Sequence, residues 1–389
     1  MSENIYSQRK MRNESLKKND FLEFLKKEAV LIIALLLAVI SCFIARPKLS
    51  YIDFKVLILL FNLMIVVEAF KELKILDSIA IGLLKKCSSY KAISTALVFI
   101  TFLAAMVVTN DVALLTFVPL TIVIARKANI DVLKIVIFQT LGANLGSSFT
   151  PMGNPQNLFI YSYFKLNPLD FFIITGPVLL LSVLFLLFLI SRDKKANLSI
   201  ELEDVKVGNK NHICIFSALF LIILLSVFHL VDYKLTLIIT IVTMLFLNKS
   251  LFSKVDFSLL LTFIGFFIFV GNISTLDSVK LFMENILGSG KSTFIASLLS
   301  SQVISNVPAT MLLSGFTTHV KELLLGVNIG GMGTLIASLA SVISYKIYSS
   351  EFEVDNNRYL KMFTYYNLVG LLIMTTIVYF ILELEMGFK

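Results

Sequence analysis

Long apolar segments recur along the whole length of this 389-residue chain. They lie near residues 29–45, 54–70, 92–108, 112–125, 171–191, 213–231, 233–247, 257–273 and 364–384. At about 1.5 Å per residue, roughly 20 helical residues match the hydrocarbon thickness of a bilayer. A membrane β-barrel would instead show short segments of alternating hydrophobicity. The sequence therefore predicts an all-α polytopic membrane protein.

The composition agrees with a membrane environment. Hydrophobic residues make up 57% of the chain and charged residues only 15%, whereas about a quarter of the residues of soluble domains are charged. The three cysteines, Cys42, Cys87 and Cys214, are scattered and odd in number. They predict neither a disulfide framework nor a metal site.

Basic residues indicate how the chain is oriented. If the N-terminus lies in the cytoplasm, most of the 34 Lys and Arg residues fall on the cytoplasmic side, as the positive-inside rule expects. The net charge of +8 is therefore a topology signal, with attraction to anionic lipid head groups, and does not indicate nucleic-acid binding. We expect a multi-pass protein of the cell membrane whose residues 1–27 are a cytoplasmic basic segment rather than a cleaved signal peptide.

Several motifs occur twice along the chain, in the same order. The pairs are DFKVLILLFNLMIVVEAF (53–70) with DFSLLLTFIGFFIFVGNI (256–273), LDSI (76–79) with LDSV (276–279), VTND (108–111) with ISNV (304–307), and LGANLG (141–146) with LGVNIG (325–330). On the topology above, the first copy runs inward and the second runs outward. Inverted repeats of this kind are typical of secondary transporters, which bind substrate and ions where discontinuous helices meet.

The repeat divides the chain into parts. We expect residues 1–27 as the N-terminal segment, 28–191 as the first repeat, 192–232 as a central cytoplasmic loop and linking helix, and 233–389 as the second repeat. Each repeat should contain one re-entrant hairpin, at 91–126 and 291–318, that enters and leaves on one side of the membrane. Each should also contain one broken helix, at 131–165 and 320–348.

The glycine- and asparagine-rich stretches predict where the helices break. Non-helical backbone at membrane depth survives only when it is buried in protein or lines a cavity. Around Gly142, Asn144 and Gly146 we expect one half-helix to end, with carbonyl groups that suit a cation. Beyond TPMGNP, at residues 150–155, a second half-helix should begin, with N–H groups that suit an anion. The hairpin tips should meet these breaks, so we expect Asn110 and Asn306 to lie close together.

The candidate substrate- and ion-binding residues are the polar and glycine residues of the tips and breaks. They are Thr109, Asn110, Asp111, Gly142, Asn144, Gly146, Ser147, Thr150, Gly153, Asn154, Asn157, Ser305, Asn306, Gly326, Asn328, Gly330, Gly333 and Thr334. Sodium could bind at Asn110, Asp111 and Asn144, and at Asn306 and Asn328. An intramembrane carboxylate such as Asp111 indicates a functional site. The alternative is that Asp111 caps a helix over 112–125.

The asparagines also have an alternative interpretation, as interhelical packing contacts. Four of them, Asn110, Asn144, Asn306 and Asn328, recur in both copies, which favours a binding site. Asn154 and Asn157 show no counterpart in the second copy of the sequence.

Other chemistries find no support in the motifs. The segment GSGKST (288–293) lacks the first glycine of a phosphate-binding loop, because Asn285 stands at that position, so no nucleotide partner is expected. No H-E-x-x-H or G-x-S-x-G motif occurs, so we expect no catalytic residues, no enzyme activity and no cofactor.

The tips and breaks resemble those of the ion transporter superfamily, which contains divalent anion/sodium symporters, citrate carriers, arsenite permeases and D-type sodium/proton antiporters. GANLGSSFTPMGNPQN and SNVPATMLL are similar to the arsenite permease and melanosomal P-protein branch. The dicarboxylate branch carries Ser-Asn-Thr at both tips, whereas this chain has TND and SNV.

This resemblance implies a scaffold domain, a moving transport domain and commonly a homodimer, with sodium or protons as the coupling ion. The expected function is secondary active transport of a small inorganic or organic anion. Efflux of arsenite or another metalloid, or sodium/proton antiport, is the alternative on the same fold.

We predict an odd number of full crossings, about nine, with the N-terminus inside and the C-terminus outside. Cysteines introduced at Ser2 and Lys389 should then react with a membrane-impermeant reagent from opposite sides of the membrane. Labelling of both positions from the same side would refute the inverted repeat.

Overall fold

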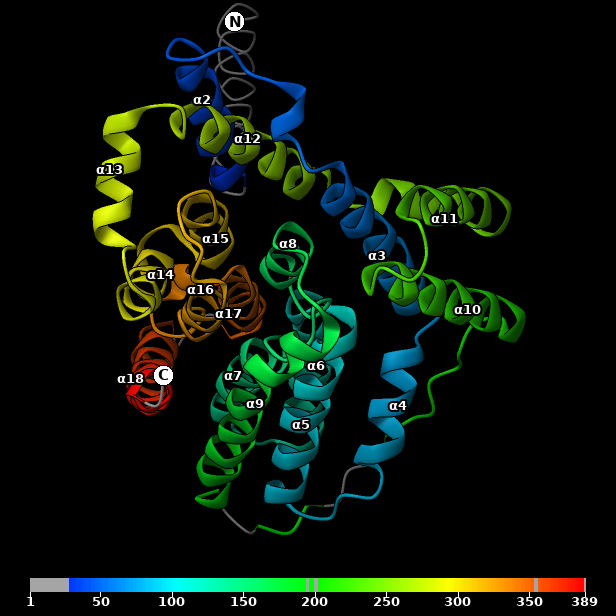
Figure 1. Cartoon of the computed structure of the whole chain (residues 1–389). Coiled ribbons are helices and arrows are strands. Elements are labelled where there is room, and N and C mark those ends of the chain that lie inside the picture. The colour runs from blue at the N-terminus through cyan, green and yellow to red at the C-terminus, as the bar shows by residue number, and fades with distance from the viewer. Residues whose placement is uncertain (1–27, 194–195, 199–201, 353–355, 388–389) are drawn as a thin grey trace, which may run out of the picture. The chain divides into compact units, whose positions relative to one another are not determined.

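The computed structural model of the chain describes residues 28–193, 196–198, 202–352 and 356–387 (Figure 1). Within these ranges the regular structure is helical, and the one β-type contact is an isolated bridge between Ser89 and Asn197. The predicted segment 1–27 lies outside the described residues, as do Ser2 and Lys389 of the labelling experiment.

The chain forms two compact units. The first contains the chain up to residue 52 together with 256–277, and the second contains 53–255 together with the chain from 278 onward. The first unit holds α2 (Ala29–Cys42), η1 (Leu49–Tyr51) and α12 (Phe257–Ile273). The second holds α3 (Phe54–Glu72), α4 (Ile75–Leu84), α5 (Tyr90–Val108), α6 (Asn110–Ala128), α7 (Leu133–Ser147), α8 (Pro155–Tyr163), α9 (Pro168–Ser191), α10 (Lys210–Val227), α11 (Tyr233–Leu247), η2 (Lys249–Lys254), α13 (Asp277–Ile286, entered from Asp277 of the first unit), α14 (Gly290–Ile304), α15 (Asn306–Ser314), α16 (Val320–Ile329), η3 (Leu335–Ala337), α17 (Leu339–Glu351) and α18 (Asn356–Gly387).

In the first unit, α12 packs along α2 through small residues. A Cβ atom added to Gly265 of α12 would stand 3.0 Å from the carbonyl oxygen of Ala34 of α2. Toward the end of α12, the Nδ2 of Asn272 donates a hydrogen bond to the Oγ of Ser41 at 3.0 Å. Small residues and interhelical hydrogen bonds of this kind hold helices together where lipid removes the hydrophobic driving force.

The repeated Asp-Phe pair begins a helix in both copies. Asp53 is the N-cap of α3 and accepts a hydrogen bond from the N–H of Val56 at 3.1 Å. Asp256 is the N-cap of α12 and accepts from the N–H of Leu259 at 2.9 Å. The same short motif thus satisfies one of the free N–H groups at the start of each helix.

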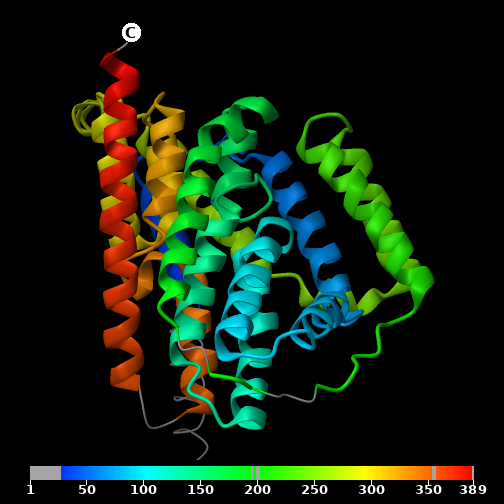
Figure 2. The same ribbon diagram turned by 90° about the horizontal axis from the view of Figure 1, so that it is seen from below.

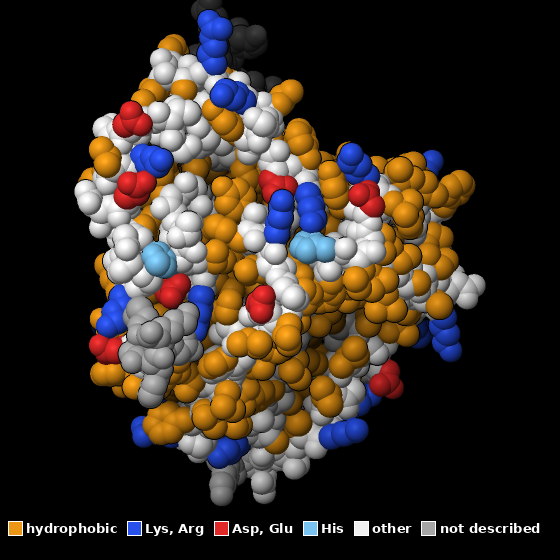
Figure 3. Space-filling view, viewed as in Figure 1, with side chains coloured by type: hydrophobic (Ala, Val, Ile, Leu, Met, Phe, Trp, Pro, Cys, Tyr) orange, Lys and Arg blue, Asp and Glu red, His pale blue; other side chains and the backbone are white. Residues whose placement is uncertain are grey.

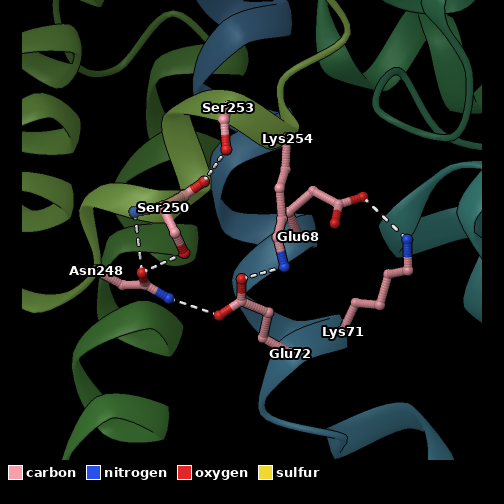
Figure 4. A network of polar contacts seen from close by, with 7 residues as sticks. All are labelled: Glu68, Lys71, Glu72, Asn248, Ser250, Ser253 and Lys254. Atoms are coloured by element: carbon pink, nitrogen blue, oxygen red, sulfur yellow. Dashed lines mark hydrogen bonds and ion pairs between the residues drawn. The ribbon is translucent and has the colours of Figure 1, made fainter.

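The other end of α3 is held by ion pairs and hydrogen bonds, which Figure 4 shows. Glu72 pairs with Lys254 of η2, and the Nδ2 of Asn248 donates to Glu72 at 2.5 Å. One turn earlier, Glu68 pairs with Lys71 at 3.3 Å. The two carboxylates of α3 are therefore engaged at a helix end.

Each hairpin turns at a single residue. Thr109 lies between α5 and α6, and Ser305 lies between α14 and α15, with φ angles of 75° and 71°. We predicted tips of several residues, but Asn110 and Asn306 already belong to the helices that follow. One residue with a positive φ separates the two helices of each hairpin, so a longer turn is not needed.

Both hairpins also begin in the same way. Ser89 caps α5 by accepting from the N–H of Ala92 at 3.2 Å. Ser289, from the GSGKST segment, caps α14 in a capping box with Ser292. The hydroxyl groups of this segment therefore serve the start of a helix.

The two predicted broken helices are both interrupted within the expected ranges. The first consists of α7 and α8 with a break over 148–154, and the second of α16 and α17 with a break over 330–338 that contains η3. Gly142, Asn144 and Gly146 lie near the end of α7, which ends at Ser147, so the prediction that a half-helix ends around them is confirmed; Asn328 likewise stands one residue before the end of α16. Isolated glycines lower helix stability by only about 1 kcal/mol each and do not end a helix by themselves.

The helix contacts of the second unit follow the repeat. The first hairpin arm packs on the first half of the broken helix in both copies, α5 on α7 and α14 on α16. The second hairpin arm packs on the second half of the other copy's broken helix, α6 on α17 and α15 on α8. Figure 1 shows these helices gathered together, and Figure 2 shows α18 as one long helix at the edge of this bundle. In both copies, therefore, the second hairpin arm contacts the broken helix of the other copy.

Four of the described helices are long and apolar enough to cross a membrane: Tyr90–Val108, Pro168–Ser191, Lys210–Val227 and the part of α18 over Asn356–Leu384. A fifth is counted if α12 and α13 form one interrupted span. Hydrophobic side chains also dominate the surface over α10 and α11 in Figure 3, where Leu221, Leu235 and Ile238 are exposed. The prediction of an all-α polytopic membrane protein is confirmed.

The number of crossings, the re-entrant course of the hairpins and the inverted orientation of the copies stay predictions. Length alone would allow α5 to span, although we expect it to be a hairpin arm. Several other expected spans are interrupted or short, which is why the length criterion finds fewer than nine.

We predict that Gly146→Ala destabilises the protein. A Cβ at Gly146 would stand 2.1 Å from the carbonyl oxygen of Phe102 in α5, so α5 and α7 would have to separate, at about 1–3 kcal/mol. The control is Gly176→Ala in α9, because nothing lies within 4 Å of the added Cβ. The midpoint of thermal unfolding in detergent should fall for Gly146→Ala only. Equal midpoints for both variants would contradict the close approach.

Candidate functional site

Asn144 of α7 is the centre of a first half-site. Its Oδ1 accepts from the Nδ2 of Asn110 at 3.2 Å and from the Oγ of Ser338 at 3.0 Å. Its Nδ2 donates to the Oγ of Ser341 at 3.2 Å and to the carbonyl of Gly331 at 3.4 Å. All four side chains that meet here are at most 4% exposed. Residues of the second repeat therefore hold the asparagine of the first.

Asn328 of α16 is the centre of a second half-site. Its Oδ1 accepts from the Nδ2 of Asn154 at 3.1 Å, and its Nδ2 donates to the Oδ1 of Asn157 at 2.7 Å. Asn154 also donates to the Oγ of Ser147 at 3.1 Å. Here residues of the first repeat hold the asparagine of the second.

The two half-sites have the same construction. In each, the asparagine before one break bonds to the last residue of the other break and to the residue three positions later. These are Ser338 and Ser341 in one case and Asn154 and Asn157 in the other. The expectation that Asn154 and Asn157 lack counterparts is therefore wrong. Serine replaces asparagine at both equivalent positions, and an identity-based comparison of the motifs does not detect that exchange.

The hairpin tips also contact the breaks in equivalent ways. The N–H of Asn110 donates to the carbonyl of Gly153 at 3.1 Å, and the Oγ of Ser305 donates to the carbonyl of Ala337 at 3.3 Å. Asn306 reaches the same cluster, since its Nδ2 would stand 3.0 Å from a Cβ on Gly331. Gly331 in turn bonds to Asn144, so both tips border one polar cluster.

Two threonines fasten the breaks to the first arms of the hairpins. The Oγ1 of Thr150 donates to the carbonyl of Met106 at 2.5 Å. The Oγ1 of Thr334 donates to the carbonyl of Gln302 at 3.0 Å. Met106 and Gln302 each stand four residues before the tip asparagine of their own copy. The alignment of the repeats that these bonds define also pairs Asn154 with Ser338 and Asn157 with Ser341.

Asp111 lies in the first turn of α6 and is partly buried. The alternative that it caps a helix over 112–125 is wrong, because α6 begins at Asn110 and Thr109 is the N-cap residue. The N–H of Asp111 donates to the Oδ1 of Asn110 at 3.0 Å. A carboxylate in the first turn is favoured by the positive end of the helix dipole. Val307 occupies the equivalent position of α15, so the charge is one-sided.

The predicted glycines serve the packing and shape of this region. Gly142, Gly146 and Gly326 let hairpin arms approach closely, since an added Cβ would stand 3.2, 2.1 and 2.6 Å from a carbonyl oxygen of the facing arm. Gly333 has a φ of 103° in the second break, a conformation that glycine adopts readily. The carbonyl of Gly330 accepts from the Nε2 of Gln302 at 2.6 Å.

Sequence reasoning missed four participants: Gly331, Gln302, Ser338 and Ser341. These residues stand at fixed distances in the sequence from Asn306 and Thr334. Their equivalence to residues of the first repeat is recognised only when the two repeats are aligned through Thr150 and Thr334.

Helix ends dominate the electrostatics of the cluster. The helices α5, α7, α14 and α16 end in this region, and α6, α8, α15 and α17 begin in it. Helix starts carry partial positive charge and helix ends partial negative charge. The cluster therefore offers both anion-binding N–H groups and cation-binding carbonyls, and none of the predicted site residues is Lys or Arg.

A largely apolar helical bundle that buries such a cluster at two interrupted helices has the construction of a membrane transporter. Residues 22–323 match the model of the citrate transporter (CitMHS) family, which covers most of the chain. The chain therefore belongs to the citrate transporter family, and the resemblance to the ion transporter superfamily is confirmed.

Relatives of the chain agree with this assignment. An uncharacterized transporter of Methanocaldococcus jannaschii is 35% identical over 318 residues, which cover 81% of this chain and 87% of that protein. The inner membrane protein YbiR of Escherichia coli is 29% identical over 301 residues, covering 76% and 80%. The P protein of Mus musculus is 32% identical over 136 residues, covering 32% and 16%. This chain is a multi-pass membrane transporter.

We predict that the residues of each half-site are energetically coupled. In a double-mutant cycle, Asn144→Ala and Ser341→Ala should show a coupling of about 0.6–1.7 kcal/mol, as interhelical hydrogen bonds in membranes do. Asn328→Ala with Asn157→Ala should do the same. Unfolding free energies of the purified variants give the values.

The control cycle combines Asn144→Ala with Ser226→Ala on α10. These two changes should be additive within about 0.3–0.5 kcal/mol because the residues share no partner. Additivity in both half-site cycles would mean that the bonds contribute nothing to the assembly.

Proposed function

We propose that this protein is a secondary active transporter of a small inorganic or organic anion, with sodium or protons as the coupling ion. The observation that carries the proposal is the pair of reciprocal half-sites at two helix breaks, of which one has a carboxylate. Substrate and ions would bind at the predicted site residues of the tips and breaks.

Helix starts would hold the anion. The N-terminal ends of α6, α8, α15 and α17 border the cluster and supply N–H groups with partial positive charge. Because no Lys or Arg occurs among the predicted site residues, these ends, the amide groups and a co-bound cation would provide the attraction. The family description makes citrate the first anion to test.

Asp111 would hold the coupling ion. It is the one acidic residue among the predicted site residues. Its N–H bonds to Asn110, which in turn bonds to Asn144 of the first half-site. A carboxylate in this setting takes up a cation or a proton, and its state changes the charge that the anion meets.

An alternative substrate is a neutral metalloid hydroxide such as arsenite, or a cation alone in sodium/proton exchange. The absence of Lys and Arg from the predicted site residues favours it, since a neutral or cationic species needs no basic partner. Uptake into proteoliposomes of citrate, other carboxylates, sulfate and arsenite, together with sodium/proton exchange, distinguishes these substrates.

The proposal also covers assembly and topology. We expect a homodimer in the cell membrane, with the N-terminus in the cytoplasm and a scaffold domain that supports a moving transport domain. The repeats over 28–191 and 233–389 and the linking segment 192–232 stay part of this proposal.

We predict that Asp111→Asn weakens the dependence of transport on sodium or pH by about 5–150-fold, the range of typical coupling free energies. The change removes the charge but keeps the size and the hydrogen-bonding capacity of the side chain, so the protein should still fold. The control is Val307→Ala at the equivalent position, which should leave the ion dependence nearly intact. If Asp111→Asn transports with unchanged ion dependence, the coupling ion is not held by this carboxylate.

A further inference from the structure

Gln302 fills the second helix break with its own amide group. Its Nε2 donates to the carbonyl of Gly330 at 2.6 Å and to the carbonyl of Met332 at 2.9 Å. Its Oε1 accepts from the backbone N–H of Thr334 at 2.9 Å. Carbonyl oxygens that converge on one point where a helix is interrupted are the arrangement that transporters use to coordinate sodium. In this protein an amide NH₂ stands at that point.

Asn157 does the same in the first break. Its Nδ2 lies 3.2 Å from the carbonyl oxygen of Ser147, 3.1 Å from that of Ser148 and 3.1 Å from that of Thr150. Asn157 is fully buried. Its Oδ1 accepts from the Nδ2 of Asn328, the centre of the second half-site. Both breaks therefore have convergent carbonyl groups, and both are closed by one neutral amide.

The orientation of each amide is determined by its partners. The oxygen and nitrogen of an amide are distinguished by the hydrogen-bond network around them. Carbonyl oxygens only accept and backbone N–H groups only donate. Gln302 must therefore turn its NH₂ toward Gly330 and Met332, and its oxygen toward Thr334. The partial positive charge of the NH₂ lies where a cation would otherwise sit.

The two breaks obtain this amide from different elements. In the first, Asn157 comes from the helix after the break, and Met106 of the hairpin arm has no donor to offer. In the second, the residue equivalent to Asn157 is Ser341, whose side chain is shorter, and the residue equivalent to Met106 is Gln302. Each break thus receives one amide, even though the sequence positions that supply it differ. This compensation indicates that filling the carbonyl group cluster is a requirement of the fold.

We propose that Asn157 and Gln302 are resident substitutes for cations, which keep sodium out of the two carbonyl clusters and confine cation uptake to Asp111. The inference rests on the proposed ion-coupled transport, because it assigns the coupling ion to one half-site only. It identifies two residues that determine ion specificity without themselves binding the ion.

The test replaces each of the two amides with a carboxylate, so that the carbonyl cluster can bind a cation. In an Asp111→Asn background, Gln302→Glu places carboxylate oxygens against the carbonyls of Gly330 and Met332, so a sodium ion or a proton must enter to relieve the repulsion. Asn157→Asp does the same in the first break. The measurement is made at alkaline pH, which disfavours the proton. Thermal unfolding of the purified full chain is followed in sodium chloride and in choline chloride at equal ionic strength. Gln139→Glu, a buried amide of α7 away from the breaks, is the matched control.

Either substitution should produce a saturable, sodium-specific rise in the unfolding midpoint on the order of 3–5 °C. Asp111→Asn alone and the Gln139→Glu control in that background should show no sodium-specific rise. A rise in Asp111→Asn alone would overturn the proposal, because the breaks would then bind sodium despite their amides. The absence of a rise in both Gln302→Glu and Asn157→Asp would overturn it as well. No transported substrate is present, so this result is separate from a failure of the transport assay.

Discussion

A helix that stops inside an apolar bundle leaves backbone groups that have no water to bond to, and this constraint governs the structure. An unpaired N–H or C=O group in hydrocarbon costs several kcal/mol. The protein meets the requirement with asparagine, glutamine, serine and threonine side chains drawn from both repeats. Asn144 and Asn328 each bond across to the opposite repeat, and Asn157 and Gln302 each satisfy the carbonyls of one break. The breaks are therefore stable features of the fold.

The exchange of partners between repeats has a mechanical consequence. The half-site bonds tie α7 to α17 and α16 to α8, and the second hairpin arms pack with the same exchange. Displacing one broken helix relative to the other would break bonds in both half-sites at once. Interhelical hydrogen bonds are individually modest, so the coupling comes from their number and from the burial of every group involved. The two broken helices and their hairpins are in this sense one cooperative element.

Equivalent construction does not make the half-sites chemically equivalent. Asp111 and Val307 occupy matching positions, so only one half-site carries a charge. Asn154 and Asn157 of the second half-site correspond to Ser338 and Ser341 of the first. The second half-site therefore joins three amide side chains, those of Asn328, Asn154 and Asn157. A pseudo-symmetric scaffold thus provides one half-site that carries a carboxylate and another that is neutral.

Local chemistry explains what the sequence determined. Apolar length defined a helical membrane protein, the Asp-Phe pair marked a helix start in both copies, and the recurring Asn motifs located both tips and both breaks. These signals depend on neighbouring residues. The sequence did not reveal that Thr109 and Ser305 alone turn the chain, or that Ser338, Ser341 and Gln302 complete the half-sites. Those features depend on which helices approach each other, because a hydrogen-bond partner is chosen by distance and reach rather than by residue type. Only the tertiary structure brings together residues as distant as Asn144 and Ser341. Only the tertiary structure shows that Gln302 supplies to the second break the amide that Asn157 supplies to the first.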